Sequence, residues 1–217
     1  MSRSALIVGG GVFGLSSAWE LRSRGWTVTL LEQGTLPHPD AASTDINKVV
    51  RMDYGSDVQY TEMGEAALEG WRAWNREWEE EVYHESGFLV MNSGPMKPGG
   101  FECDSFDLLT ARGHELQRLT REDLQKRHPE WRAEGYLNPR GGWGDSTGAV
   151  VHLKREAVRS GVEVIEEVCL PAPLRIDESG DLKKVVSRDG RQWMAEVVVI
   201  AAGAWTPVLR PQLADVM

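Results

Sequence analysis

The sequence has few cysteines and no long apolar run, and each shortage excludes a class of protein. Its 217 residues include only two cysteines, Cys103 and Cys169, which are not in a CxxC spacing. Two distant thiols cannot form the disulfide framework of a secreted scaffold, so we expect a reducing, intracellular setting. No window approaches the roughly 18 apolar residues that a membrane span requires. We therefore expect a soluble protein that does not act on a membrane.

Acidic residues outnumber basic ones, and the sequence shows neither paired histidines nor a recognisable targeting signal. The chain has 24 basic and 33 acidic side chains, a net charge of −9 at pH 7. This balance argues against nucleic acid as a partner, because phosphate backbones attract clustered positive charge. The five histidines show no HExxH or paired spacing, so we expect no metal site. No targeting signal is recognisable, so we expect a cytoplasmic or peroxisomal location.

The first part of the chain predicts a βαβ unit. Residues 4–8 are a short apolar run typical of a buried parallel strand, and residues 11–24 have helical spacing that ends before Gly25. Residues 26–31 predict a second strand, which ends at Glu32. A strand, a glycine turn, a helix and a strand within about thirty residues make a complete βαβ unit.

The turn of this unit has the spacing GxGxxG, which favours a dinucleotide site over a turn without a ligand. Its glycines allow a tight turn, close approach of a pyrophosphate and close packing of helix on strand. The N–H groups that open the helix attract phosphate, and the acid that ends the second strand is placed to accept hydrogen bonds from a ribose. The candidate cofactor-binding residues here are Gly9, Gly11, Val12, Phe13, Gly14, Glu32 and Gln33.

The middle of the chain predicts a long amphipathic helix. Apolar residues recur at steps of three or four from Met63 to Val82, and the stripe includes Ala67 and three tryptophans. We interpret this stripe as the buried face of a helix, in preference to an aromatic platform for a ligand. The other expected elements are a strand over 87–91, a loop over 91–100, helices over 120–127 and 146–159, a strand over 162–165, a hairpin over 181–193 that turns at 189–190, and a buried strand from 197 that enters a glycine turn at 203.

Four stretches together resemble a known family. They are the glycine turn with Glu32, the segment 43–54, the stretch 141–143 with its following helix, and the Ala-Gly-Ala-Trp of 202–205. A nicotinamide dehydrogenase would continue with alternating strands and helices, whereas this chain returns to sheet only near residues 162 and 197. The sequence resembles the FAD-dependent amine oxidoreductases, the group of monomeric sarcosine oxidase, fungal fructosyl amino acid oxidases and pipecolate or saccharopine oxidases.

The resemblance implies a fold and its division. It implies an α/β protein, with a Rossmann-type FAD-binding domain and part of a second, mixed α+β substrate domain. Residues 1–55 would form the FAD-binding βαβ unit and a loop beside the flavin, and residues 56–140 the partial substrate domain. Residues 141–217 would return to the FAD-binding domain and leave its sheet incomplete.

The resemblance also implies roles for two basic residues. The residue matching Lys48 lies close to the flavin ring, where a fixed ammonium stabilises the negative charge that develops as electrons reach the flavin and oxygen. Arg51 matches an arginine that pairs with the substrate carboxylate, a task that suits its planar fork. Without the resemblance, two exposed charges on a polar loop would be the favoured reading. Further cofactor contacts are implied at Ser43, Thr44, Lys48, Val168, Ala202, Gly203 and Trp205.

The implied activity is FAD-dependent oxidation of the C–N bond of a secondary amine or N-substituted amino acid. Oxygen would be the acceptor and would leave as peroxide. Two alternatives stay open: a truncated, catalytically inactive flavoprotein fragment, because family members continue for about as long again after the position of Gly203, and an NAD-dependent dehydrogenase. Neither Cys103 nor Cys169 lies where the family attaches its flavin covalently. The substrate and the oligomeric state are left open by the sequence.

Overall fold

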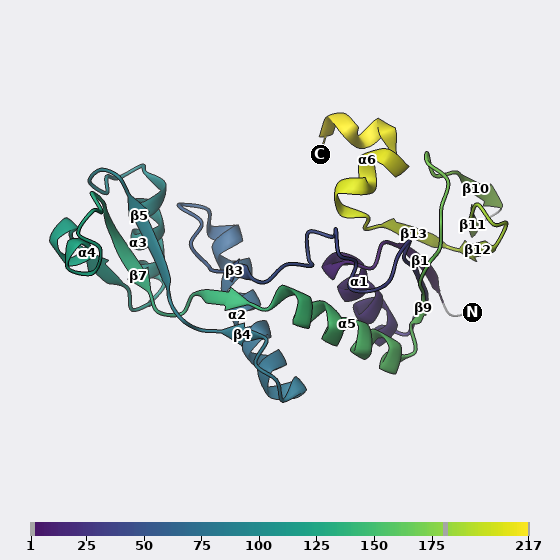
Figure 1. The fold of residues 1–217 in the computed structure, drawn as a ribbon, viewed down its shortest axis with the longest axis horizontal. Coiled ribbons are helices and arrows are strands. Elements are labelled where there is room, and N and C mark those ends of the chain that lie inside the picture. The colour runs from purple at the N-terminus through teal and green to yellow at the C-terminus, as the bar shows by residue number, and fades with distance from the viewer. Residues whose placement is uncertain (1–2, 180–181, 217) are drawn as a thin grey trace. The chain divides into compact units, whose positions relative to one another are not determined.

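The computed structural model describes residues 3–179 and 182–216, and the chain divides into two compact units. Unit 1 comprises residues 1–46 and 146–217, and unit 2 comprises residues 47–145. Figure 1 shows both units and labels their elements where there is room. The predicted division into a cofactor domain and a substrate domain remains a prediction.

Unit 1 is built on a parallel sheet, as the βαβ reading predicts. Its four strands lie in the order β13-β1-β2-β9, and each neighbouring pair is parallel. The central strand carries the continuous apolar run, and its last four residues are buried, as expected for a strand covered on both faces. The strands are β1 (Ser4–Val8), β2 (Thr27–Leu31), β9 (Glu163–Ile165) and β13 (Val197–Ile200).

Two helices of unit 1 pack against each other through small and branched side chains. In α1 (Val12–Ser23) the buried apolar residues are Leu15 and Ala18, which follow one face at a spacing of three. In α5 (Ser146–Ser160) Ala149, Leu153 and Ala157 repeat every four residues and are buried. Both helices end just before a glycine of positive φ, as the sequence predicts.

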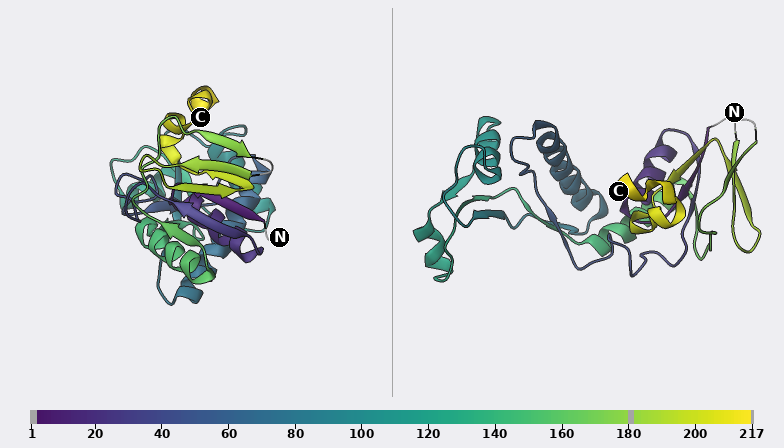
Figure 2. Two further views of the ribbon diagram at one scale, coloured as in Figure 1. Left: turned by 90° about the vertical axis from the view of Figure 1, so that its right-hand side faces the viewer. Right: turned by 90° about the horizontal axis from the view of Figure 1, so that it is seen from above.

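An antiparallel sheet adds a second layer to unit 1. The predicted hairpin is present as β11 (Leu182–Val186) and β12 (Gln192–Ala195), and its expected start at residue 181 lies outside the described residues. Leu6 and Val8 of the parallel sheet share a core cluster with Val185 and Ala195 of this hairpin, and Figure 2 shows the strands together. The remaining elements of unit 1 are β10 (Ile176–Ser179), η1 (Gly203–Trp205), α6 (Thr206–Leu209) and η2 (Pro211–Val216).

The strand β13 is less buried than its sequence predicts. We expect a buried strand there, but Val197 is 39% exposed and the next three residues are only half-buried. The reason is its position, because among the described strands β13 pairs with β1 alone and so lies at the edge of the parallel sheet.

Unit 2 combines helices with two small antiparallel sheets. The predicted strand near 87–91 and helix near 120–127 are confirmed, and a capping box of Thr120 and Asp123 starts the second. The helix α3 (Phe101–Ala111) was not predicted from the sequence. The helices are α2 (Val58–Trp78), α3 (Phe101–Ala111) and α4 (Arg121–Arg127); the sheets are β3 (Lys48–Val50), β8 (Gly142–Gly144) and β4 (Tyr83–His84), and β5 (Phe88–Asn92), β7 (Glu134–Asn138) and β6 (Gln117–Leu119).

The predicted helix in the middle of the chain is present, and Trp78 of the predicted stripe is buried, but the first half of the helix buries a different face. The stripe predicts burial of Met63 and Ala67, and both are exposed in α2. Thr61, Gly64 and Leu68 are buried instead, because the helix packs this face on Met52. The three tryptophans follow the helix as a row of ring contacts, with Trp71–Trp74 at 5.1 Å and Trp74–Trp78 at 4.7 Å between centroids.

A cluster of charges joins α2 to the end of α3. Glu65 accepts two hydrogen bonds from Arg112, at 2.9 Å from Nε and 2.7 Å from Nη2, and lies 2.7 Å from His114 Nε2. The hydrogen bonds from Arg112 are the main reason that the pKa of Glu65 falls to about 2; partial burial opposes them and His114 assists them. The ionised form of Glu65 is thus stabilised by folding.

We predict that this cluster makes stability depend on pH. Because the folded pKa of Glu65 is depressed, its contribution is complete above about pH 4.5 and is lost as the pH falls toward about 2. The free energy of unfolding, measured by urea denaturation across this range, should fall less steeply in Glu65→Gln than in the unmodified chain. Glu77→Gln, an exposed position on the same helix, should follow the unmodified chain. Parallel curves for all three proteins would contradict the assignment.

Candidate functional site

Predicted cofactor residues from distant segments meet at the carboxyl ends of the parallel strands. Val8 of β1 pairs with Leu31 of β2 on one side and with Ile200 of β13 on the other. The residues that follow these strands, Gly9, Glu32 and Ala201, therefore leave the sheet side by side. Ligands of open α/β sheets bind at this edge.

The glycine turn is too tight for side chains. Gly9 has a φ of +105°, and a Cβ there would lie 2.5 Å from the carbonyl oxygen of Ala201. A Cβ on Gly14 would lie 1.8 Å from the carbonyl oxygen of Gly9. A Cβ on Gly11 would lie 3.2 Å from Ser43 Oγ, which accepts a hydrogen bond from Val12 N at 3.3 Å. The turn thus brings bare backbone to the N-terminus of α1, the arrangement that suits a phosphate.

Glu32 is buried against this turn. Its carboxylate accepts hydrogen bonds from Gly10 N at 2.7 Å, Gln33 N at 2.8 Å and Gly34 N at 3.2 Å. A carboxylate offers about four acceptor sites, so these bonds leave room for a ribose hydroxyl. Val168 lies next to it, because its N–H donates to the carbonyl of Glu32 at 2.8 Å while its side chain is in the core.

Thr44 supplies an observation that points to a ligand. Its hydroxyl oxygen is buried and has no hydrogen-bond partner among the described residues. A buried hydroxyl without a partner costs about 1–3 kcal/mol, so such groups are rare unless something else satisfies them. Together with the glycine turn, this donor fits the phosphate-bearing, hydroxyl-rich part of a dinucleotide such as FAD.

The other predicted residues of unit 1 are more open. Phe13 is 79% exposed at the start of α1, and the side chain of Gln33 is exposed. Ala202 is half-buried, and Gly203 is exposed with a φ of +52°. Trp205 is half-buried and contacts the ring of His38 edge-on, with 5.6 Å between centroids.

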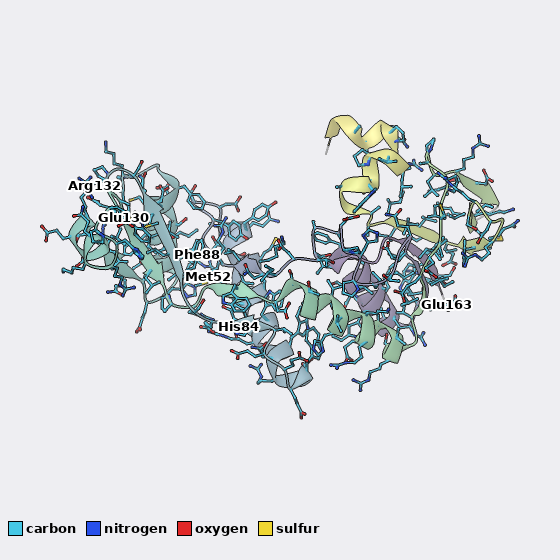
Figure 3. The ribbon with its side chains drawn as sticks, viewed as in Figure 1. Met52, His84, Phe88, Glu130, Arg132 and Glu163 are labelled. Carbon is cyan, nitrogen blue, oxygen red and sulfur yellow. The ribbon has the colours of Figure 1, made fainter. Side chains whose placement is uncertain are left out.

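The two basic candidates lie in unit 2. Lys48 opens β3 opposite Gly144 of β8 and is exposed. Arg51 is half-buried, and its Nη1 donates to the carbonyl oxygen of Asp53. Its guanidinium carbon lies 4.7 Å from the ring centroid of Tyr54 and 5.7 Å from those of Phe88 and Phe101. Figure 3 labels Phe88 and the buried Met52, both in unit 2.

A buried polar network next to Arg51 was missed by the sequence reading. The carboxylate of Asp53 accepts hydrogen bonds from Tyr136 Oη at 2.7 Å and Asn138 Nδ2 at 3.1 Å, and all three residues are fully buried. Burial, and then the negative charge of Asp53, raise the pKa of Tyr136 above its usual value. The available signal is the spacing of Tyr136 and Asn138, two residues apart on one face of β7.

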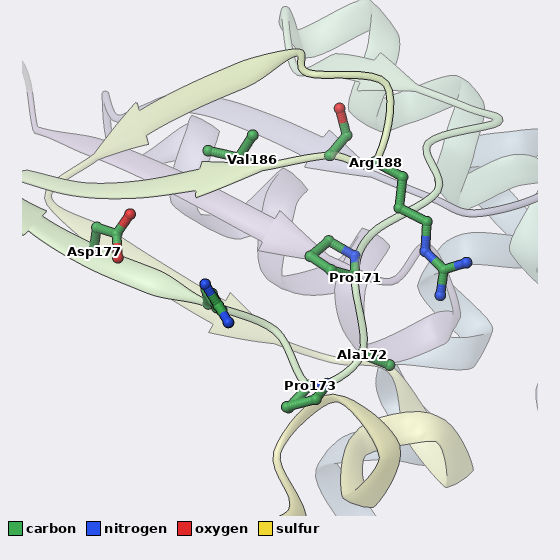
Figure 4. A pocket seen from close by; sticks show the side chains of 8 residues that line it. Pro171, Ala172, Pro173, Asp177, Val186 and Arg188 are labelled. Carbon is green, nitrogen blue, oxygen red and sulfur yellow. The ribbon is translucent and has the colours of Figure 1, made fainter.

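A separate pocket of about 500 Å³ opens in unit 1 (Figure 4). None of its lining residues belongs to the predicted cofactor set, and its charged groups are two arginines and an aspartate. The lining residues are Pro171, Ala172, Pro173, Arg175, Asp177, Val186, Ser187 and Arg188.

Two further findings concern the described residues, 3–179 and 182–216. No helix among them is long and apolar enough to cross a membrane. No group of three or more histidine, cysteine, aspartate or glutamate side chains among them is placed to hold a metal ion.

Comparison with known families decides the membership of the chain. Residues 4–217 match the family model described as FAD dependent oxidoreductase. The chain belongs to this family. The predicted resemblance to FAD-dependent amine oxidoreductases is therefore confirmed, as is the α/β fold with a parallel sheet of the FAD-dependent oxidoreductases.

Individual members of the FAD-dependent oxidoreductase family support this result. L-saccharopine oxidase of Schizosaccharomyces pombe is 27% identical over 94% of this chain and 52% of that enzyme. The peroxisomal sarcosine oxidase of Homo sapiens is 26% identical over 95% of this chain and 52% of that enzyme. The solved fructosamine oxidase of Aspergillus fumigatus, Amadoriase II, is 30% identical, with a TM-score of 0.71 over 95% of this chain and 48% of that one. The chain thus spans about half the length of the relatives it matches.

We predict that the turn cannot accept a methyl group. Gly14→Ala should destabilise unit 1 by several kcal/mol, because its Cβ would overlap the Gly9 carbonyl. The measurement is urea denaturation of the purified chain. The control is Gly70→Ala, a helical position with nothing within 4 Å of the added Cβ, which should gain about 0.5–1 kcal/mol. A Gly14→Ala protein as stable as the unmodified chain would show that the turn is not as tight as described.

Proposed function

We propose that the chain binds FAD at the carboxyl edge of the unit 1 sheet and serves the oxidation of a C–N bond in a secondary amine or N-substituted amino acid. The observation that carries the proposal is the glycine turn, which only bare backbone fits and which Ser43 contacts, together with the buried hydroxyl of the next residue, Thr44, which has no hydrogen-bond partner among the described residues. FAD, when bound, would supply the two-electron redox chemistry by which the C–N bond becomes a C=N bond and oxygen is reduced to hydrogen peroxide. The family match favours this reading over an NAD-dependent dehydrogenase.

The residues of unit 1 would hold the pyrophosphate and the adenosine part of the cofactor. Gly9, Gly11 and Gly14 would admit the pyrophosphate, and the first N–H groups of α1, at Val12 and Phe13, would face it. Ser43 and Thr44 would donate to its phosphates. Glu32 would accept from the ribose, beside Gln33, and the backbone of Val168 would lie against the adenine. On the other side, Ala202 and Gly203 would approach the cofactor, with Trp205 packed behind them.

The residues of unit 2 would serve the reaction. Lys48 follows Thr44 by four residues in the sequence. Its ammonium would stabilise negative charge on the flavin and on oxygen. Arg51 would bind the carboxylate of the substrate, since one edge of its fork has no acceptor among the described residues.

The partners and the setting follow from this proposal. The partners would be a small amine or amino acid and oxygen. The predicted cytoplasmic or peroxisomal location is kept as a proposal, and the human relative is named as peroxisomal. Because the chain spans half the length of its relatives, activity of this chain by itself is part of what is proposed.

The first test is a flavin titration with a variant at Thr44. The purified chain should quench the fluorescence of added FAD with a saturable curve. Thr44→Val should weaken FAD binding by about 10- to 100-fold, since a hydrogen bond to a charged group contributes about 1.5–3 kcal/mol. The same variant should raise stability without FAD, because it removes a buried hydroxyl that has no hydrogen-bond partner in the described part of the chain. Thr110→Val, exposed on α3, is the control and should change neither quantity.

Two results would contradict this proposal. A chain that binds no FAD would overturn the cofactor assignment, and binding of NAD instead would support the dehydrogenase. If Thr44→Val binds FAD as tightly as the unmodified chain, the hydroxyl has no part in the site.

The second test concerns Lys48. Lys48→Met should slow peroxide formation from N-methyl amino acids by about 10²–10³-fold, the usual loss when a fixed donor to developing charge is removed. The FAD-loaded chain is assayed for peroxide at saturating substrate and several oxygen concentrations. Lys97→Met, an exposed position in the loop before α3, should leave the rate unchanged. An equal rate in Lys48→Met would remove Lys48 from the reaction.

A further inference from the structure

Asp53 is a buried acid to which the proposed function gives no role. Its side chain is fully buried and accepts hydrogen bonds from Tyr136 Oη at 2.7 Å and Asn138 Nδ2 at 3.1 Å. Asn138 is itself fixed, because its Oδ1 accepts from Arg140 N at 3.1 Å. A buried carboxylate is costly unless it is hydrogen-bonded, and here both donors come from β7. Asp53 is thus anchored to the central strand of the β5-β7-β6 sheet.

The backbone around Asp53 is held as firmly as the side chain. Two residues on, Gly55 N donates to Ser105 Oγ at 2.6 Å, and Ser105 is fully buried in α3. The segment 53–55 is therefore fixed at one end to β7 and at the other to α3. Its main chain has little freedom to rotate, so the carbonyl of Asp53 points in a set direction.

That carbonyl holds one corner of the guanidinium of Arg51. Arg51 Nη1 donates to it, and this is the only hydrogen bond of the Arg51 side chain among the described residues. Tyr54 and Phe88 contact the guanidinium through their rings, at 4.7 Å and 5.7 Å from its central carbon. A guanidinium has five N–H donors, and a carboxylate needs two that are parallel. The held corner leaves the remaining donors for a ligand.

We propose that Asp53, held by Tyr136 and Asn138, is a positioning residue that orients Arg51 for bidentate binding of a carboxylate. The proposal rests on the proposed function in one respect, the pairing of Arg51 with the substrate carboxylate. Its physical content is that an anchored carbonyl and flanking rings fix the plane of the guanidinium before the ligand arrives. Without the hydrogen bonds of Asp53, the guanidinium of Arg51 can rotate. Ligand binding must then order the guanidinium, and this entropic cost weakens the affinity.

The test uses the full chain labelled with 15N-arginine, without added cofactor. The side-chain signal of Arg51 is assigned by its loss in Arg51→Lys. The chain is titrated with N-methylglycine, and with N-methylglycinamide as a probe that lacks the carboxylate. In the unmodified chain the Arg51 signal should shift with the acid and not with the amide.

Two variants loosen the anchor and one serves as the control. Asp53→Asn and Tyr136→Phe should each weaken the response to N-methylglycine about tenfold, the factor that about 1.4 kcal/mol represents. Tyr83→Phe removes another buried tyrosine hydroxyl of unit 2, one that donates to the carbonyl of Arg140 at 2.7 Å, and should bind as the unmodified chain does. A merely structural role would lower stability without changing the preference for the acid over the amide.

The outcomes separate this inference from the proposed function. If the unmodified chain binds the acid and both variants bind it equally well, the positioning role is overturned while Arg51 keeps its role. If Arg51 in the unmodified chain does not respond to the acid, the carboxylate site and the positioning role are both wrong. A chain that shows the expected pattern but binds no FAD would support the inference and contradict the proposed cofactor. Tyr136→Phe decides the matter if Asp53→Asn does not fold.

Discussion

The close approach of the glycine turn to the ends of β1, β2 and β13 is the constraint on which unit 1 depends. The register of the parallel strands places Gly9 between the residues that follow the two neighbours, and the carbonyl of Ala201 occupies the space of a side chain. The same packing presses Gly14 onto the Gly9 carbonyl and directs the N-terminus of α1 to this edge. The position of Glu32, whose carboxylate accepts a hydrogen bond from Gly10 N, follows from this packing.

Two chain segments, near residues 45–48 and 144–147, connect the units, and they are hydrogen-bonded to each other. On the side of unit 1, the carbonyl of Asp45 accepts from Ser146 Oγ at 2.8 Å and from Thr147 Oγ1 at 2.9 Å. On the side of unit 2, β3 and β8 pair with Lys48 opposite Gly144. The outgoing and returning segments therefore support one another, and Lys48 and Arg51 start from an anchored strand instead of a free loop.

The sequence predicted the parts of the fold that local pattern controls. The apolar run of β1, the glycine spacing and the capping box at Thr120 are read directly, because each depends on neighbouring residues. The exposure of Met63 could not be read, since helical period does not say which face another element covers. Asp53 was missed for a similar reason: its partners are 83 and 85 residues away, and only the tertiary fold brings them together.

The edge position of β13 has a consequence for handling the protein. Its outward backbone groups pair with no described strand, and its four residues are all valine or isoleucine. Such an edge, without lysine, proline or a bulge to blunt it, is a template for a strand from another molecule. Colloidal stability of the chain in concentrated solution therefore depends on how this short edge is shielded.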